Sequence, residues 1–164
     1  MGAFRLVSLL VATGSTGLVA GIVLAYANSV MPGLAKADDR TFVDAAQRLN
    51  TAIHNPLFMA VSNAALLCTA LAAGLHLPAD HRDVLPWTGA ALVLYAVTLV
   101  VTLAVNVPLN HALIAAGDPD GVPDLAAVRE RFEARWNRMN ALRTATTVAA
   151  FCCLLGALAV RTYS

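Results

Sequence analysis

The chain has 164 residues, of which 59% are hydrophobic and only 13% charged, so its composition is typical of a membrane protein and not of a soluble domain. Eleven basic and ten acidic residues nearly cancel, which argues against nucleic-acid binding because that function needs a concentrated positive face. The length fits a single domain over residues 1–164, and the three cysteines lack the paired spacing of a zinc site or a disulfide framework.

The first apolar stretch, residues 6–30, carries no charge and is long enough to cross a hydrocarbon core of about 30 Å at about 1.5 Å per residue. Its glycines form a small-residue face that would let a neighbouring helix approach closely: Gly14, Gly17 and Gly21. Ala25-Tyr26-Ala27 resembles a signal-peptidase site, but the apolar part is longer than in such a peptide. We therefore favour a retained span over a cleaved one.

A short amphipathic helix is predicted over residues 39–53. It follows Met31-Pro32-Gly33-Leu34, which we expect to end the first span because Pro32 disfavours helix at the residue before it. Asp38 or Asp39 can cap the new helix. Its apolar side chains fall on one stripe, Phe42, Ala46, Leu49 and Ile53. Since its charges exclude it from the lipid core, it should lie at the interface or fold over the mouth of the bundle.

Two further spans follow this helix. Asn55 and Pro56 are typical of an N-cap and a first helical position, and the uncharged residues 55–75 form the second predicted span. His76 and His81 fall in a polar connection and are expected at the surface. The third span covers about residues 85–107 and runs into Asn-Val-Pro-Leu-Asn-His, where Pro108 should kink or end the helix because it lacks an N–H and clashes one turn back.

The last helix is predicted to begin after residues 117–123, a segment dense in turn formers. It starts with charged residues near Asp124 and continues without Gly or Pro into a fourth span at about residues 141–160. Four spans place both termini on one side of the membrane. Eight of the eleven Lys and Arg residues then lie on the other side, which favours a cytoplasmic location for that side in a bacterial-type inner or plasma membrane.

Polar groups from four distant segments are therefore expected to meet at one mouth of an all-α, integral membrane four-helix bundle. On the last helix, Phe132, Trp136, Met139 and Arg143 are spaced by four, three and four residues and form one stripe. Such a stripe suits a flat apolar ligand that carries an oxygen. Simpler roles remain open for its members and their neighbours: Trp136 as an interfacial anchor, Arg143 reaching headgroups, Asn55 as a cap, and His54 and His111 facing solvent.

These motifs resemble, in chain order, those of the anthrone oxygenase-like family of small four-span membrane proteins. The matching segments are Met31-Pro32-Gly33-Leu34, Phe42-Val43 through Gln47 and Asn50, Asn55-Pro56-Leu57-Phe58, Thr102 through Asn106-Val107-Pro108-Leu109-Asn110, and Arg135-Trp136 with Asn140 and Arg143. The resemblance implies a four-helix membrane bundle and the oxidation of an anthrone to an anthraquinone by molecular oxygen, without flavin or haem. Met139 departs from the family pattern, which usually has a second tryptophan there.

The implied reaction needs a site that holds a planar apolar body, stabilises a developing oxyanion and accepts a proton. Candidate oxyanion donors are Asn106, Asn110, Asn140 and Arg143. Histidine exchanges protons near neutral pH, so the candidate bases are His54 and His111, with Asp44 as the alternative. Candidate substrate-binding residues are Asn50, Asn55, Phe58, Arg135, Trp136 and Met139. Molecular oxygen is the expected co-substrate, and no other cofactor is expected.

Two other functions fit the same residues. A metal centre could be built from His54, His111 and a carboxylate such as Asp44, although these residues have no metal-binding spacing. A non-catalytic membrane protein could instead use the pocket to hold a lipid, a quinone or a partner subunit. The expected partners are membrane lipid and a small apolar aromatic molecule, and a homo-oligomer is compatible with the sequence.

Overall fold

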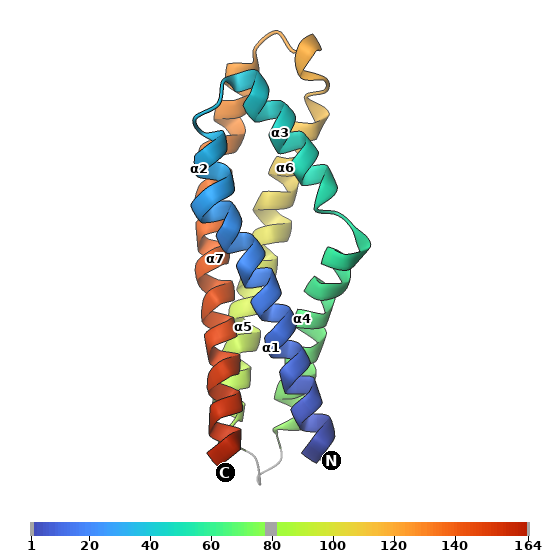
Figure 1. Ribbon diagram of the computed structural model, residues 1–164, viewed down its shortest axis with the longest axis vertical. Coiled ribbons are helices and arrows are strands. Elements are labelled where there is room, and N and C mark those ends of the chain that lie inside the picture. Colours follow the sequence, from blue (N-terminus) through green and yellow to red (C-terminus); the bar gives the residue numbers. More distant parts are fainter. Residues whose placement is uncertain (1, 78–81, 164) are drawn as a thin grey trace.

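The computed structural model describes residues 2–77 and 82–163, and every regular element in these ranges is a helix (Figure 1). Four helical columns stand side by side, with the two ends of the chain at the same end of the bundle. The first column is α1 (Gly2–Ala25), η1 (Tyr26–Val30) and α2 (Met31–Leu34), and the second is α4 (Pro56–Leu75). The third is α5 (Leu85–Val101), η3 (Thr102–Asn106) and α6 (Val107–Ala115), and the fourth is α7 (Leu125–Tyr163).

Each column is long and apolar enough to cross a membrane, so the prediction of an all-α four-span membrane bundle is confirmed. The longest, α7, runs for 39 residues without interruption. This continuity follows from its sequence, which contains no glycine or proline before Gly156. The Asp124 carboxylate caps its start by accepting a hydrogen bond from the Ala127 N–H at 2.9 Å.

The first and third columns do not end at their prolines, contrary to the prediction for Pro32 and to one of the two outcomes predicted for Pro108. Each helix instead widens to a π-helical turn, η1 or η3, and then continues as α-helix beyond the proline. In both cases the π turn ends two residues before the proline. A proline ring clashes with the carbonyl four residues earlier, and a wider turn moves that carbonyl away. The helices therefore pass their prolines and reach Leu34 and Ala115.

The amphipathic helix α3 (Asp39–Ala52) lies across the end of the bundle opposite the chain termini and packs against α6 and α7 (Figure 1). Asp38 is its N-cap, with the Thr41 N–H donating to Oδ1 at 3.0 Å. This bond, together with one from the Thr41 hydroxyl, lowers the pKa of the Asp38 carboxyl from its usual value. Phe42 and Val43 are fully buried on the inner face, so α3 covers the mouth.

Two polar side chains hold α3 in this position. Arg129 of α7 donates to the carbonyl oxygens of Ala35 and Ala37, each at 2.9 Å, and its guanidinium lies 4.5 Å from the centre of the Phe42 ring. Gln47 of α3 donates from Nε2 to the carbonyl oxygens of Leu113 and Gly117, each at 2.9 Å. The mouth is therefore closed by a helix tied to both neighbouring columns.

Two predictions made from the sequence, one about the glycines of the first span and one about the exposure of His76, are wrong. Of the three glycines on α1, only Gly17 makes room for a neighbour, because a Cβ there would lie 2.8 Å from the Phe151 ring while Gly14 and Gly21 meet nothing within 4 Å. His76 is not at the surface: it is 1% exposed, with Nδ1 2.7 Å from the Ala72 carbonyl oxygen. This bond to the helix's own last turn gives Nδ1 a partner inside the protein, as a buried polar group requires. His81 lies outside the described residues.

Candidate functional site

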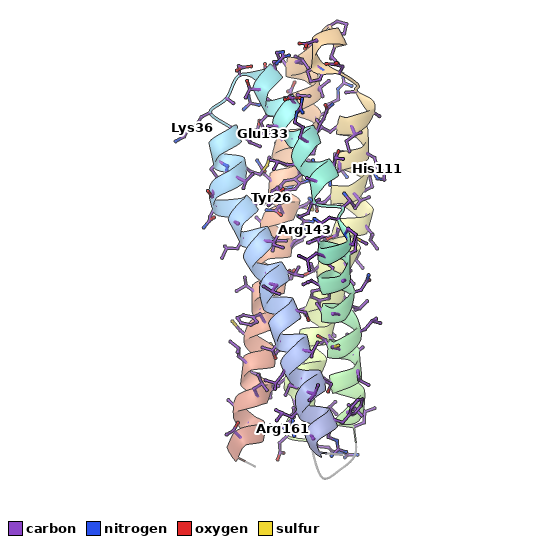
Figure 2. All side chains as sticks on the ribbon, turned by 45° about the vertical axis from the view of Figure 1, so that its right-hand side comes forward. Tyr26, Lys36, His111, Glu133, Arg143 and Arg161 are labelled. Atoms are coloured by element: carbon purple, nitrogen blue, oxygen red, sulfur yellow. The ribbon has the colours of Figure 1, made fainter. Side chains whose placement is uncertain are left out.

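A cavity of about 90 Å³ is lined by residues of α3, of the two π turns and of α7, and α7 packs against both π turns. All four columns and α3 contribute to its wall. Figure 2 labels two of the lining residues, Tyr26 and Arg143. The lining residues are Ile22, Val23, Tyr26, Asn50, Ile53, His54, Phe58, Thr102, Val107, Asn110, Trp136 and Arg143.

Arg143 brings a positive charge to this largely apolar cavity. Its Nη2 donates to Asn140 Oδ1 at 2.6 Å and its Nη1 to Thr102 Oγ1 at 3.5 Å, while Nε is buried without a hydrogen-bond partner among the described residues. The ion pairs found in the described part of the chain involve other arginines. A guanidinium surrounded only by neutral dipoles favours a ligand that brings negative charge.

Trp136 forms an aromatic wall beside the guanidinium. It is 3% exposed, its Nε1 donates to Asn110 Oδ1 at 2.8 Å, and the Arg143 Cζ lies 5.5 Å from its ring centre. The Tyr26 ring lies 6.0 Å from the indole at an angle of 47°. The alternative role of Trp136 as an interfacial anchor is therefore wrong, because the indole is enclosed by protein.

Four of the five candidate asparagines divide into two pairs. Asn50 and Asn110 line the cavity, and the Asn110 amide nitrogen remains available because only its oxygen is used by Trp136. Asn106 and Asn140 are fully buried behind the wall: Asn106 Nδ2 donates to the Trp136 carbonyl at 3.4 Å and Asn140 Nδ2 to the Val23 carbonyl at 3.3 Å. The second pair is thus placed to position Trp136 and Arg143 rather than to touch a ligand.

The two candidate histidine bases lie in different surroundings. Both histidines are exposed, but His54 lines the cavity, whereas His111 lies at the outer edge of the bundle (Figure 2) and is absent from the lining. His54 Nδ1 is 2.7 Å from the Asn50 carbonyl oxygen. Because a carbonyl oxygen only accepts hydrogen bonds, Nδ1 carries the proton in the neutral ring and Nε2 is the basic nitrogen.

Of the remaining candidate residues, only Phe58 lines the cavity. Phe58 lines the cavity, but Asn55 serves as the N-cap of α4, accepting from the Phe58 N–H at 3.0 Å. Arg135 is exposed and Met139 is half-buried, and neither is part of the lining. Asp44 is turned to Arg48, at 2.9 Å, and no group of three His, Cys, Asp or Glu side chains able to hold a metal ion occurs in the described ranges.

Tyr26 was not among the predicted site residues, because it drew attention only as part of Ala25-Tyr26-Ala27, a pattern that resembles a signal-peptidase site. A usable signal was nonetheless present. Tyr26 lies six residues before Pro32, and Thr102 lies six residues before Pro108, so both are the first residues of π turns. Such turns occur frequently at functional sites.

A family model described as anthrone oxygenase matches residues 52–153. This range covers more than half of the chain and includes most of the cavity-lining residues, among them His54, Thr102, Asn110, Trp136 and Arg143. Comparisons with curated proteins and with solved structures found no match. On the strength of the family model, and in agreement with its sequence motifs, the chain belongs to the anthrone oxygenase family.

Proposed function

We propose that this protein is a membrane-embedded oxygenase that oxidises a planar aromatic substrate such as an anthrone with molecular oxygen. Family membership supports an oxygenase-like function. The observation that carries the finer proposal is Arg143, whose guanidinium faces an aromatic-walled cavity and bonds only to neutral oxygens. A donor of this kind stabilises an oxyanion strongly in a site that excludes water.

The reaction begins with proton removal at the carbon opposite the anthrone carbonyl, and His54 Nε2 is the candidate base. The electron pair moves to the carbonyl oxygen and forms the anthrolate, whose charge Arg143 stabilises. Molecular oxygen adds to the deprotonated carbon, forming a C–O bond, and the peroxide takes up a proton. Loss of the second proton from that carbon breaks the O–O bond and releases hydroxide, which becomes water.

Anthrone plus oxygen therefore gives anthraquinone plus water, so the electrons balance without an external reductant. The remaining groups in the cavity bind and orient. Trp136 and Phe58 supply ring faces, and the free amide hydrogens of Asn110 supply a further donor. None of these residues carries electrons, because anthrone itself supplies all the electrons that reduce oxygen.

The size of the cavity implies that its wall moves when substrate binds. At about 90 Å³ it is smaller than an apolar cavity of about 150 Å³ that accepts benzene, so a three-ring molecule does not fit without displacement. Ile53, His54 and Phe58 come from the corner between α3 and α4, and α4 packs against α1 and α5 rather than against α3. We expect substrate to enter here, from the lipid side.

The test is oxygen uptake and quinone absorbance with anthrone and the full-length protein in lipid nanodiscs. We expect turnover above the autoxidation seen with empty nanodiscs, and a loss of about 10²- to 10³-fold in kcat for Arg143→Met. Arg138→Met is the matched control, because Arg138 is an exposed arginine of the same helix outside the cavity lining. Wild-type turnover no faster than autoxidation would overturn the proposal, and a co-purified lipid or quinone would then favour the binding alternative.

A further inference from the structure

Tyr26 is an ionisable residue of the cavity that the proposed reaction leaves without a role. Its ring and the Arg143 guanidinium border the same indole, at 6.0 Å and 5.5 Å from the Trp136 ring. Both groups line the cavity. The Tyr26 hydroxyl has no hydrogen-bond partner among the residues that the structure describes, so its O–H is available to a ligand.

We propose that the Tyr26 hydroxyl and the Arg143 guanidinium form a donor pair that binds the ionised oxygen of a planar phenol or enol. The catalytic part of this inference rests on the proposed function, whereas the binding preference does not need turnover. The guanidinium supplies the charge, and the phenolic O–H supplies a neutral donor. Hydrogen bonds from such donors to an anionic oxygen are shorter and about twice as strong as those between neutral groups.

The two π turns support the pairing of Tyr26 with Arg143, because each turn begins with a residue that carries a hydroxyl. Tyr26 and Thr102 are the first residues of η1 and η3, and each carries a hydroxyl. The Thr102 hydroxyl accepts from Arg143 Nη1 at 3.5 Å while donating to the Thr98 carbonyl at 2.7 Å, so its proton is already used. The Tyr26 hydroxyl has no such second partner in the described part of the chain. The two hydroxyls therefore have different roles: Thr102 orients Arg143, and Tyr26 completes the oxyanion site.

The cavity lining also contains no acidic side chain that would compete with an anionic ligand for Arg143. Its members include no Asp or Glu, so no carboxylate of the lining neutralises Arg143. Asn140 Oδ1, at 2.6 Å from Nη2, orients the guanidinium without cancelling its charge. A neutral phenol gains less than its anion from two donors, and the site should therefore prefer the ionised form.

The binding test uses 2-naphthol, a two-ring phenol whose ionisation changes its absorbance and fluorescence. With the full-length protein in nanodiscs, we expect the titration midpoint of bound 2-naphthol to lie about one to three pH units below that of the free compound. Tyr26→Phe keeps the ring and removes the hydroxyl, and should weaken binding of the anion by about tenfold. Tyr95→Phe is the matched control, because Tyr95 donates to the Ser62 carbonyl and lies outside the cavity lining.

Binding of 2-methoxynaphthalene, which cannot ionise, shows whether each variant keeps an intact cavity. Tyr26→Phe should bind it as well as wild type does. Equal affinity of wild type and Tyr26→Phe for 2-naphtholate would overturn the inference, as would an unshifted titration midpoint in wild type. A loss of 2-methoxynaphthalene binding in Tyr26→Phe would also overturn it, because the hydroxyl would then be holding the fold.

Turnover separates this inference from the proposed function. We expect Tyr26→Phe to lower kcat for anthrone by about 10- to 100-fold with KM changed by less than about threefold, because anthrone is neutral until its proton is removed. Rapid turnover by both proteins would leave the oxygenase proposal standing and overturn the role of Tyr26. Preferential naphtholate binding without turnover would overturn the oxygenase proposal and leave the anion site standing.

Discussion

Asn140 shows how one side chain can support a site without touching its ligand. Its oxygen accepts from Arg143 at 2.6 Å and its nitrogen donates to the Val23 carbonyl at 3.3 Å, so it connects the guanidinium to the first span. Asn110, which lines the cavity, orients Trp136 by accepting a hydrogen bond from the indole N–H at 2.8 Å. Both are neutral acceptors. They fix the orientation of Arg143 and Trp136 and leave the positive charge for a ligand.

The two candidate histidines provide a direct residue-level test of the proposed base. We expect His54→Gln to lower kcat for anthrone by about 10²- to 10⁴-fold, because it removes the basic nitrogen in the cavity. His111→Gln should stay within about twofold of wild type, since His111 is exposed outside the lining. The measurement is quinone formation at saturating anthrone across a pH series. A large effect of His111→Gln with none from His54→Gln would reverse the assignment.

At the scale of elements, the π turns decide which side chains reach the cavity. A π turn adds one residue to a helix, so residues before it are rotated by about 100° relative to a continuous α-helix. Thr102 and Asn106 are the ends of η3, and they reach the guanidinium and the Trp136 carbonyl respectively. Both contacts depend on Pro108 keeping the turn wide.

We therefore expect Pro108→Ala to change stability and activity in opposite directions. Alanine restores an N–H and removes the ring clash, so the segment can return to a regular α-helix and resist heat better. The same change rotates Thr102 away from Arg143, and anthrone turnover should fall by about tenfold or more. Thermal unfolding in nanodiscs and oxygen uptake measure the two effects. Pro119→Ala, in the loop beyond the third span, is the control, and unchanged turnover in Pro108→Ala would contradict the role given to η3.

The π turns also explain which parts of the site were predictable from sequence. Trp136 and Arg143 lie on α7, an unbroken helix, so the spacing of four and three residues correctly predicted that they share a face. Tyr26 is the first residue of a π turn, where the helical period no longer gives the direction of a side chain. Asn106 and Asn140 were correctly placed near the site by sequence, but their amide nitrogens donate to backbone carbonyls of other columns, and no spacing rule predicts those bonds.

Over the whole molecule, large apolar side chains cover the outside of the four columns, and the buried interior combines apolar clusters with polar side chains. Large exposed apolar residues occur along all four columns, including Leu18, Leu67, Val93, Val100 and Leu155. In water such a surface would be an anomaly, but in lipid it is the expected exterior. The overall bundle was predictable for this reason: four long apolar segments and their short connections determine it.

The orientation of the bundle is a prediction that only the whole molecule can test. Of the eight basic residues on the site-bearing side, Arg143 is held in the cavity and Arg129 is bound to backbone carbonyls. Six others remain near the membrane surface, against three on the side of the termini: Lys36, Arg40, Arg48, Arg131, Arg135 and Arg138 against Arg5, Arg82 and Arg161. The positive-inside rule then still favours a cytoplasmic mouth, with both termini outside.

Reporter fusions at the C-terminus of the full-length chain test this orientation in a bacterial inner membrane. We expect a phosphatase that needs the periplasm to be active, and a green fluorescent protein in the same position to be dark. Changing the six basic residues to Gln should lower the phosphatase signal, because it removes the charge difference that sets the orientation. A bright C-terminal fluorescent fusion in the unmodified chain would mean that the mouth faces outward and that its arginines reflect the site rather than the topology.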